Sequence, residues 1–219
     1  MTTDTTGARE EILARVRRAL ADVPPDEAPA VPRTYLREHG RLNQAATIDL
    51  LAENLADYRA HVHRSTEADL PATIAGLLDD RGSTSVAIPQ SLPEPWLAQL
   101  HPDTTLVPDA PDLTPRRLDG VHAVVSACAL AIAETGTIVL DGGPGQGRRQ
   151  LTLVPDHHIC VVRVPEQVVA SVPQALERLD PTRPQTWIAG PSATSDIELD
   201  RVEGVHGPRI LDVILITAE

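Results

Sequence analysis

The segment AIAETGTIVLDGG, residues 131–143, places one carboxylate and two hydroxyls beside the apolar residues of an expected strand. Glu134 ends a run of small apolar residues, and Thr135 and Thr137 flank Gly136. A half-desolvated carboxyl group has a raised pKa, which suits general acid–base or nucleophilic chemistry. In the alternative interpretation, Glu134 accepts hydrogen bonds from backbone amides of the adjacent turn and holds the loops together. The residues taken by themselves favour this structural alternative.

A second candidate is the segment AGPSATSDIE, residues 189–198, in which hydroxyls follow a glycine–proline turn. Ser195 and Glu198 have the spacing of a capping box, which predicts a short helix that ends near Gly204. A helix N-terminus at the end of a sheet strand is an anion site. A capped helix with no ligand is the alternative, and the two interpretations are compatible. The hydroxyls concerned are those of Ser192, Thr194 and Ser195.

The histidines do not form a recognisable metal motif. His206 lies between glycines in EGVHGPRIL, residues 203–211, with Arg209 close by, and a single histidine in a turn is more often structural than catalytic. His157 and His158 are adjacent, so in a strand they point to opposite faces. The histidines of HVH, residues 61–63, fall in an expected helix, where they do not share a face. No metal site is therefore predicted.

The glycine-rich loop DGGPGQGRRQ, residues 141–150, suggests nucleotide binding at first sight. A dinucleotide fingerprint requires a helix directly after the loop, but the following residues LTLV, 151–154, are typical of a strand. The sequence therefore predicts a β-hairpin whose loop is exposed. Arg148 and Arg149 could still contact an anionic ligand, with a solvated basic turn as the alternative.

Hydrophobic spacing predicts the elements that position these groups. Apolar residues recur at helical spacing in four segments, with Thr47 as the expected N-cap of the second: residues 9–20, 47–63, 69–80 and 168–179. Short apolar runs predict strands at residues 84–89, 104–108, 122–127, 137–140, 151–154, 158–164, 186–190 and 211–216. Strands that alternate with helices indicate an α/β sheet, and continuously apolar strands indicate burial on both faces.

The first expected helix is followed by the proline-rich acidic segment DVPPDEAPAVPR. Such a segment is typical of a linker, so the helix is an arm free to dock on a partner or on its own domain. We therefore expect an N-terminal helix and linker over residues 1–45 and an α/β domain over residues 46–219.

Composition excludes several classes of function. The formal net charge of −12 and the scarcity of aromatic residues disfavour nucleic acid and anionic membranes as partners. The chain has no lysine, which excludes Schiff-base chemistry and a P-loop lysine. Cys128 and Cys160 are too few to hold a four-thiolate iron–sulfur cluster. No apolar run has membrane-spanning length and the first residues lack a signal-peptide pattern, so we expect a soluble cytoplasmic protein.

Four segments in one order resemble the lactate-utilization LutC/YkgG family, the stand-alone LUD-domain proteins: AIAETGTIVL, HHICVV, GPSATSDIE and GVHGPRILDVILI. The resemblance extends over roughly residues 121–216 and includes the N-terminal EILARVRRAL and the PRTY segment. It implies an open sheet with helices on both faces, like the NagB, ribose-5-phosphate isomerase and CoA-transferase group. It also implies a role in the oxidation of L-lactate to pyruvate beside two iron–sulfur proteins, with no cofactor held by this chain.

The resemblance gives motif positions rather than established catalytic residues. Glu134 loosely resembles the nucleophilic glutamate of class I CoA transferases, and with this resemblance we expect it to be a catalytic base or orienting group beside a bound carboxylate. The other positions carried over are Thr135, Gly136, Thr137, Gly190, Pro191, Ser192, Thr194, Asp196, His206, Gly207 and Pro208, and Arg209 is added as a charge for a small carboxylate. We expect Glu134 and the segment around Ser192 to converge in space.

Two functions stay open at this point. The first is a non-redox subunit of a lactate-oxidising system, which binds a small carboxylate or a partner protein. The second is an independent enzyme of the CoA-transferase or sugar-phosphate-isomerase type. The missing lysine counts against ribose-5-phosphate isomerase activity.

Overall fold

The computed structural model describes residues 5–23, 31–32, 34–194, 202–203 and 206–217. The chain divides into two compact units, residues 1–35 and residues 36–219. In the first unit, the expected N-terminal helix is α1 (Thr5–Ala19), whose Arg15 pairs with Glu11 at 2.6 Å. The side chains of Ile12 and Val16 are exposed on α1. This helix therefore leaves an apolar stripe uncovered within its own unit.

The second unit is built on a parallel sheet of six strands in the order β1-β12-β7-β4-β2-β3. The strands are β1 (His61–Thr66), β2 (Ser85–Ile88), β3 (Thr105–Pro108), β4 (Ala123–Ala127), β7 (His157–Arg163) and β12 (Ile210–Thr217). The central strands are apolar along nearly their whole length because both of their faces are covered.

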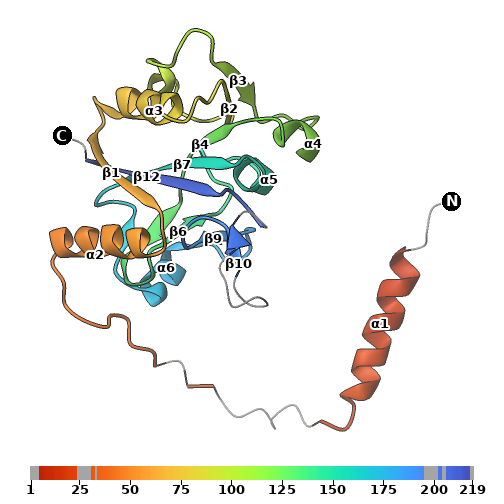
Figure 1. Ribbon diagram of the computed structural model, residues 1–219. Helices are drawn as coiled ribbons and strands as arrows, with labels where there is room; N and C mark the ends of the chain where they lie inside the picture. The colour runs from red at the N-terminus through yellow and green to blue at the C-terminus, as the bar shows by residue number, and fades with distance from the viewer. Residues whose placement is uncertain (1–4, 24–30, 33, 195–201, 204–205, 218–219) are drawn as a thin grey trace. The chain divides into compact units, whose positions relative to one another are not determined.

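Helices cover both faces of this sheet (Figure 1). On one face, α3 (Leu70–Asp79) and the 3-10 helix η1 (Glu94–Leu97) pack on alternate residues of β7 and β12 such as Ile159 and Ile214. On the other face, α2 (Gln44–Asp57) packs on the intervening residues, such as Val213. The prediction of an open α/β sheet with helices on both faces is therefore confirmed.

A smaller sheet lies on the α2 side and carries the sequence motifs. Its strands have the order β8-β5-β6-β9, and β5 and β9 pair with β6 in antiparallel fashion. The bounds are β5 (Leu130–Ile132), β6 (Thr137–Leu140), β8 (Val168–Val169) and β9 (Thr186–Ile188). The 3-10 helix η2 (Ala133–Thr135) connects β5 to β6, and α6 (Val172–Arg178) follows β8. The remaining elements are α4 (Pro115–Leu118), α5 (Arg149–Leu153) and the antiparallel pair β10 (Ala193–Thr194) and β11 (Val202–Glu203).

The second helix differs from its prediction at both ends. Its N-cap is Asn43 rather than Thr47, because the Asn43 side chain accepts the N–H of Ala46 at 2.8 Å. It ends fourteen residues later, and Arg59 then adopts a φ of +68°. The predicted C-terminal part of the helix is instead strand β1, which pairs with β12.

The prediction of a hairpin over residues 137–154 is wrong in its second half. Residues 151–154 fall in α5 and its C-terminal end, and β6 pairs with β5 and β9 instead. A four-residue apolar run fits a buried helix turn as well as a strand. Leu151 is fully buried against Val124 and Leu118, which selects the helix.

Two other helix predictions also need revision. The segment 168–179 begins with strand β8, and its helix α6 starts only after Ser171, whose hydroxyl caps it. The short helix expected from Ser195 lies mostly outside the described residues. At the ends of that segment, Ala193 and Thr194 pair with Glu203 and Val202.

Candidate functional site

Glu134 lies in η2 and connects the smaller sheet to α6. Its carboxylate accepts the N–H of Val172 at 2.7 Å and contacts Nδ1 of His39 at 2.8 Å. Its own N–H donates to the carbonyl of Ala170 at 3.1 Å. Val172 is the first residue of α6, so Glu134 fixes the start of that helix. These contacts are those of the structural alternative, and a catalytic role for Glu134 stays a prediction.

The residues after Glu134 pack directly on α2. Thr135 Oγ1 donates to Thr137 Oγ1 at 2.8 Å, so the two hydroxyls bond each other. Gly136 has a φ of +55°, and a Cβ built there would lie 2.7 Å from the carbonyl carbon of Asn54. The Asn54 side chain also donates to the carbonyl of Ala133 at 2.8 Å. Both the left-handed backbone and the close approach require glycine at this position.

The glycine of the second motif meets the end of the same helix. Gly190 has a φ of +83°, and a Cβ there would overlap the carbonyl oxygen of Tyr58, the residue after α2. Because β6 pairs with β9, with Ile138 opposite Ile188, the segments that carry the two motif glycines run side by side along α2.

Described residues of the second and third motifs are joined by hydrogen bonds. The N–H of Ser192 donates to the carbonyl of Pro208 at 2.8 Å, and its hydroxyl accepts the N–H of His206 at 3.0 Å. These residues line a cavity of about 230 Å³, which we call the motif cavity. Its lining includes Gly190, Pro191, Ser192, His206, Gly207 and Pro208. The structure thus brings together half of the motif positions carried over from the family, those of the second and third motifs.

His158 also lines the motif cavity and was not among the predicted site residues. Its side chain is buried, and Nε2 lies 2.7 Å from the hydroxyl of Ser126. Nδ1 is buried and has no hydrogen-bond partner in the described part of the chain. In the described part of the chain, Nδ1 of His157 and Nε1 of Trp96 are also buried without a hydrogen-bond partner. The sequence showed only that His157 and His158 face opposite ways, which the structure confirms.

Two thiols lie deeper on the same face of the sheet. Cys160 is two residues beyond His158 on β7, and Cys128 follows β4; both are buried and free. Hydrogen bonding with Cys128 is the main cause that lowers the pKa of Cys160, to about 5, while burial acts to raise it. Hydrogen bonds with His158 and Ser126 lower the pKa of Cys160 further. Cys160 is therefore the more acidic thiol of the pair.

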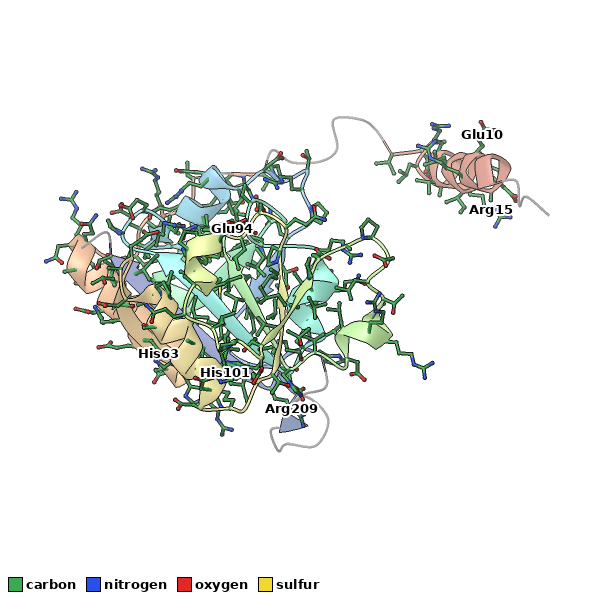
Figure 2. The ribbon with its side chains drawn as sticks, turned by 90° about the horizontal axis from the view of Figure 1, so that it is seen from above. Glu10, Arg15, His63, Glu94, His101 and Arg209 are labelled. Atoms are coloured by element: carbon green, nitrogen blue, oxygen red, sulfur yellow. The ribbon has the colours of Figure 1, made fainter. Side chains whose placement is uncertain are left out.

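Glu134 and the charged residues proposed beside it lie elsewhere. Glu134 and Ser192 share no hydrogen-bond partner in the described part of the chain, and the lining of the motif cavity does not include Glu134. Arg209, at the margin of the domain in Figure 2, is paired with Asp156, which raises its pKa. Arg148 is paired with Asp109 at 2.6 Å.

The last two predicted residues follow Ser192. Thr194 belongs to β10, and its backbone pairs with Val202. Asp196 lies outside the described residues.

A buried polar cluster occupies the other face of the large sheet, and the sequence did not predict it. The carboxylate of Asp212, on β12, lies 2.6 Å from Nε2 of His63 and 2.8 Å from Nε2 of His157. Nη2 of Arg81 lies 3.2 Å from the same carboxylate. Burial acts to raise the pKa of Asp212, but hydrogen bonds with His157 and His63 outweigh it and lower the pKa to about 2. The cluster was missed because His63 was assigned to a helix, whereas β1 places it beside β12.

Within the described residues, no group of three or more histidine, cysteine, aspartate or glutamate side chains is arranged to hold a metal ion. In the same part of the chain, no helix combines the length and the apolar character needed to cross a membrane.

The described geometry can be compared with known families. A family model described as the LUD domain matches residues 48–216. The chain belongs to the LUD domain family. The matched range begins in α2 and ends in β12, so the LUD domain contains both sheets and the motif cavity.

Similar LUD-domain proteins span nearly the whole chain. "Lactate utilization protein C" of Deinococcus radiodurans is 41% identical over 216 residues, which cover 97% of each chain. An uncharacterized protein of Neisseria meningitidis is 28% identical over 226 residues, which cover 95% of this chain and 93% of that one. A crystal structure of a DUF162 family protein from Deinococcus radiodurans has a TM-score of 0.68 and 38% identity, and covers 80% of this chain and 99% of the other.

Proposed function

We propose that this chain takes part in lactate utilization, as a subunit without a redox group of its own in a system that oxidises L-lactate to pyruvate. The observation that carries the proposal is the similarity to a lactate utilization protein C at 41% identity over 97% of both chains. A match of that extent includes the arm, both sheets and the motif segments.

In this proposal the electrons of lactate pass to partner proteins that hold iron–sulfur clusters. The chain has two cysteines, both buried, whereas a cluster of the common type uses four thiolates. Cluster ligands would therefore be supplied by other chains of the system.

We further propose that the motif cavity holds a small carboxylate. Its volume of about 230 Å³ suits a molecule the size of lactate or pyruvate better than a dinucleotide. The Ser192 hydroxyl accepts from the N–H of His206, which leaves its own proton to donate. His158 adds a polar ring to the same lining. The Ser192 hydroxyl can donate to one oxygen of a small carboxylate.

Deletion of the gene tests the functional proposal. We expect the deletion strain to lose growth on L-lactate while it keeps growth on pyruvate, and the tagged chain to copurify with iron–sulfur proteins. Normal growth of the deletion strain on L-lactate would contradict the proposal. Turnover of acyl-CoA or sugar phosphates by the isolated chain would instead favour the independent enzyme.

A further inference from the structure

A second and larger cavity lies at the carboxyl edge of the six-stranded sheet. It has a volume of about 680 Å³ and is lined by residues that follow β2 and β3, by the glycine-rich loop and by the residues around the start of β9. Ligands of open α/β sheets gather at the carboxyl ends of the strands. We call it the arginine cavity because Arg148, Arg149 and Arg183 line it.

The arginines give this cavity a positive charge in an acidic protein. The lining includes three arginines and two aspartates, Asp109 and Asp141, so its own net charge is +1. The chain as a whole has a net charge of −12. Arg149 makes no side-chain hydrogen bond or ion pair with any residue that the structure describes. Its guanidinium is therefore available to an anion.

The other two arginines are held in place with donors to spare. Nε of Arg148 donates to the carboxylate of Asp109 at 2.7 Å, and its Nη2 donates to the carbonyl of Ala110 at 2.6 Å. These bonds do not involve Nη1. Nη1 of Arg183 forms an ion pair with the carboxylate of Asp141 at 2.8 Å. Because the aspartates orient the guanidinium groups in advance, little side-chain entropy is lost when an anion binds. Guanidinium groups of this kind match the oxygens of a phosphate.

The remaining lining is suited to an uncharged group. Pro89, Pro111, Leu140 and Pro184 contribute apolar surface beside the arginines. A cavity of about 680 Å³ exceeds what inorganic phosphate fills and lies in the range of pockets for organic ligands.

The glycine-rich loop is followed by a helix. The sequence analysis disfavoured a dinucleotide fingerprint here because it expected a strand at residues 151–154, where the structure has the five-residue helix α5. The loop runs from β6 to α5 and carries left-handed glycines at Gly142, Gly145 and Gly147. It therefore shapes one wall of the cavity instead of forming the tip of a hairpin.

We propose that the arginine cavity binds an organic phosphate, a molecule with one or more phosphate groups on an uncharged body. Arg149 and the free donors of Arg183 and Arg148 bind the phosphate oxygens, and the proline-rich wall contacts the body. This site is separate from the motif cavity, and the proposal does not depend on lactate.

Calorimetric titration of the full chain with ADP as the probe tests this site, with adenosine as the uncharged control. We expect ADP to bind with a Kd below about 1 mM and adenosine to bind at least tenfold more weakly. Arg149→Gln removes no side-chain hydrogen bond or ion pair with a described residue, so it should keep the melting temperature and weaken the binding of ADP several-fold. The double variant, Arg149→Gln with Arg183→Gln, should bind ADP at least tenfold more weakly than the wild type does.

The matched control is Arg116→Gln, which makes the same change of charge on α4, outside the cavity lining. It should change the affinity for ADP less than twofold. The proposal would be overturned by absent ADP binding, by adenosine binding as tightly as ADP, or by equal effects of Arg116→Gln and Arg149→Gln.

Discussion

At the scale of single residues, Glu134 has the contacts of a connector between η2 and α6. Its carboxylate accepts the N–H of Val172, and a glutamine oxygen can accept the same bond. We therefore expect Glu134→Gln to keep the melting temperature within a few degrees and to restore growth on L-lactate in the deletion strain. Growth curves and a thermal melt check this. If the Glu134→Gln variant is stable but does not restore growth on L-lactate, the catalytic role holds instead.

The buried charge of Asp212 contributes to stability in a pH-dependent way. Its pKa is lowered from 3.8 to about 2 in the folded protein, so its contribution is fully present above about pH 4 and is lost as the pH falls toward 2. The contribution is roughly 2 kcal/mol. We expect Asp212→Asn to lower the free energy of unfolding at pH 7 by about 3 kcal/mol, because two histidines and Arg81 lose their buried anion.

Urea unfolding between pH 7 and pH 2 measures both effects. Asp49→Asn is the control, since Asp49 forms an exposed pair with Arg64 and should change stability by less than about 1 kcal/mol. If Asp212→Asn is no less stable than Asp49→Asn, or keeps the full pH dependence of the wild type, the role assigned to this cluster is wrong.

At the scale of elements, the fold depends on how closely the smaller sheet approaches α2. Gly190 and Gly142 both have positive φ, +83° and +69°, but a Cβ at Gly142 meets nothing within 4 Å, whereas one at Gly190 meets Tyr58. Gly142→Ala should cost about 1 kcal/mol of backbone strain. Gly190→Ala should cost at least ~2 kcal/mol more because the strand must move away from α2. Equal losses in denaturant unfolding would show that contact with α2 is unimportant.

Elements with a complete hydrophobic signal could be predicted from the sequence. The runs at residues 158–164 and 211–216 are apolar without interruption because β7 and β12 are covered on both faces, and the structure has both strands. Residues 61–66 contain polar side chains, and the partner of His63 is Asp212, 149 positions away in the sequence. Only strand pairing reveals that they form β1, so local spacing assigned part of them to the preceding helix.

The same distinction applies to the candidate site. Glycine, serine and histidine motifs could be recognised by type, and Gly190, Ser192 and His206 do line one cavity. His158 could not be chosen over its neighbour His157, because the choice depends on which face of β7 meets the smaller sheet. The sequence placed Glu134 beside the second motif, but its side chain turns toward α6.

At the scale of the whole molecule, the LUD domain has cavities at two places on one sheet. The motif cavity includes Leu211 and His158, near the amino ends of β12 and β7, and the arginine cavity adjoins the carboxyl ends of β2 and β3. Thr186 of β9 lines both. The two proposed sites therefore share one lining residue of β9.

Complementation of the deletion strain with His158→Gln tests the central claim most directly. Glutamine keeps a polar group near Ser126 but replaces the imidazole that lines the motif cavity. We predict that the wild-type gene restores growth on L-lactate, and that His158→Gln, present at the same level and with a melting temperature within a few degrees, does not. Both strains should grow equally on pyruvate. Full growth of the His158→Gln strain on L-lactate would contradict the assignment of the motif cavity as the working site.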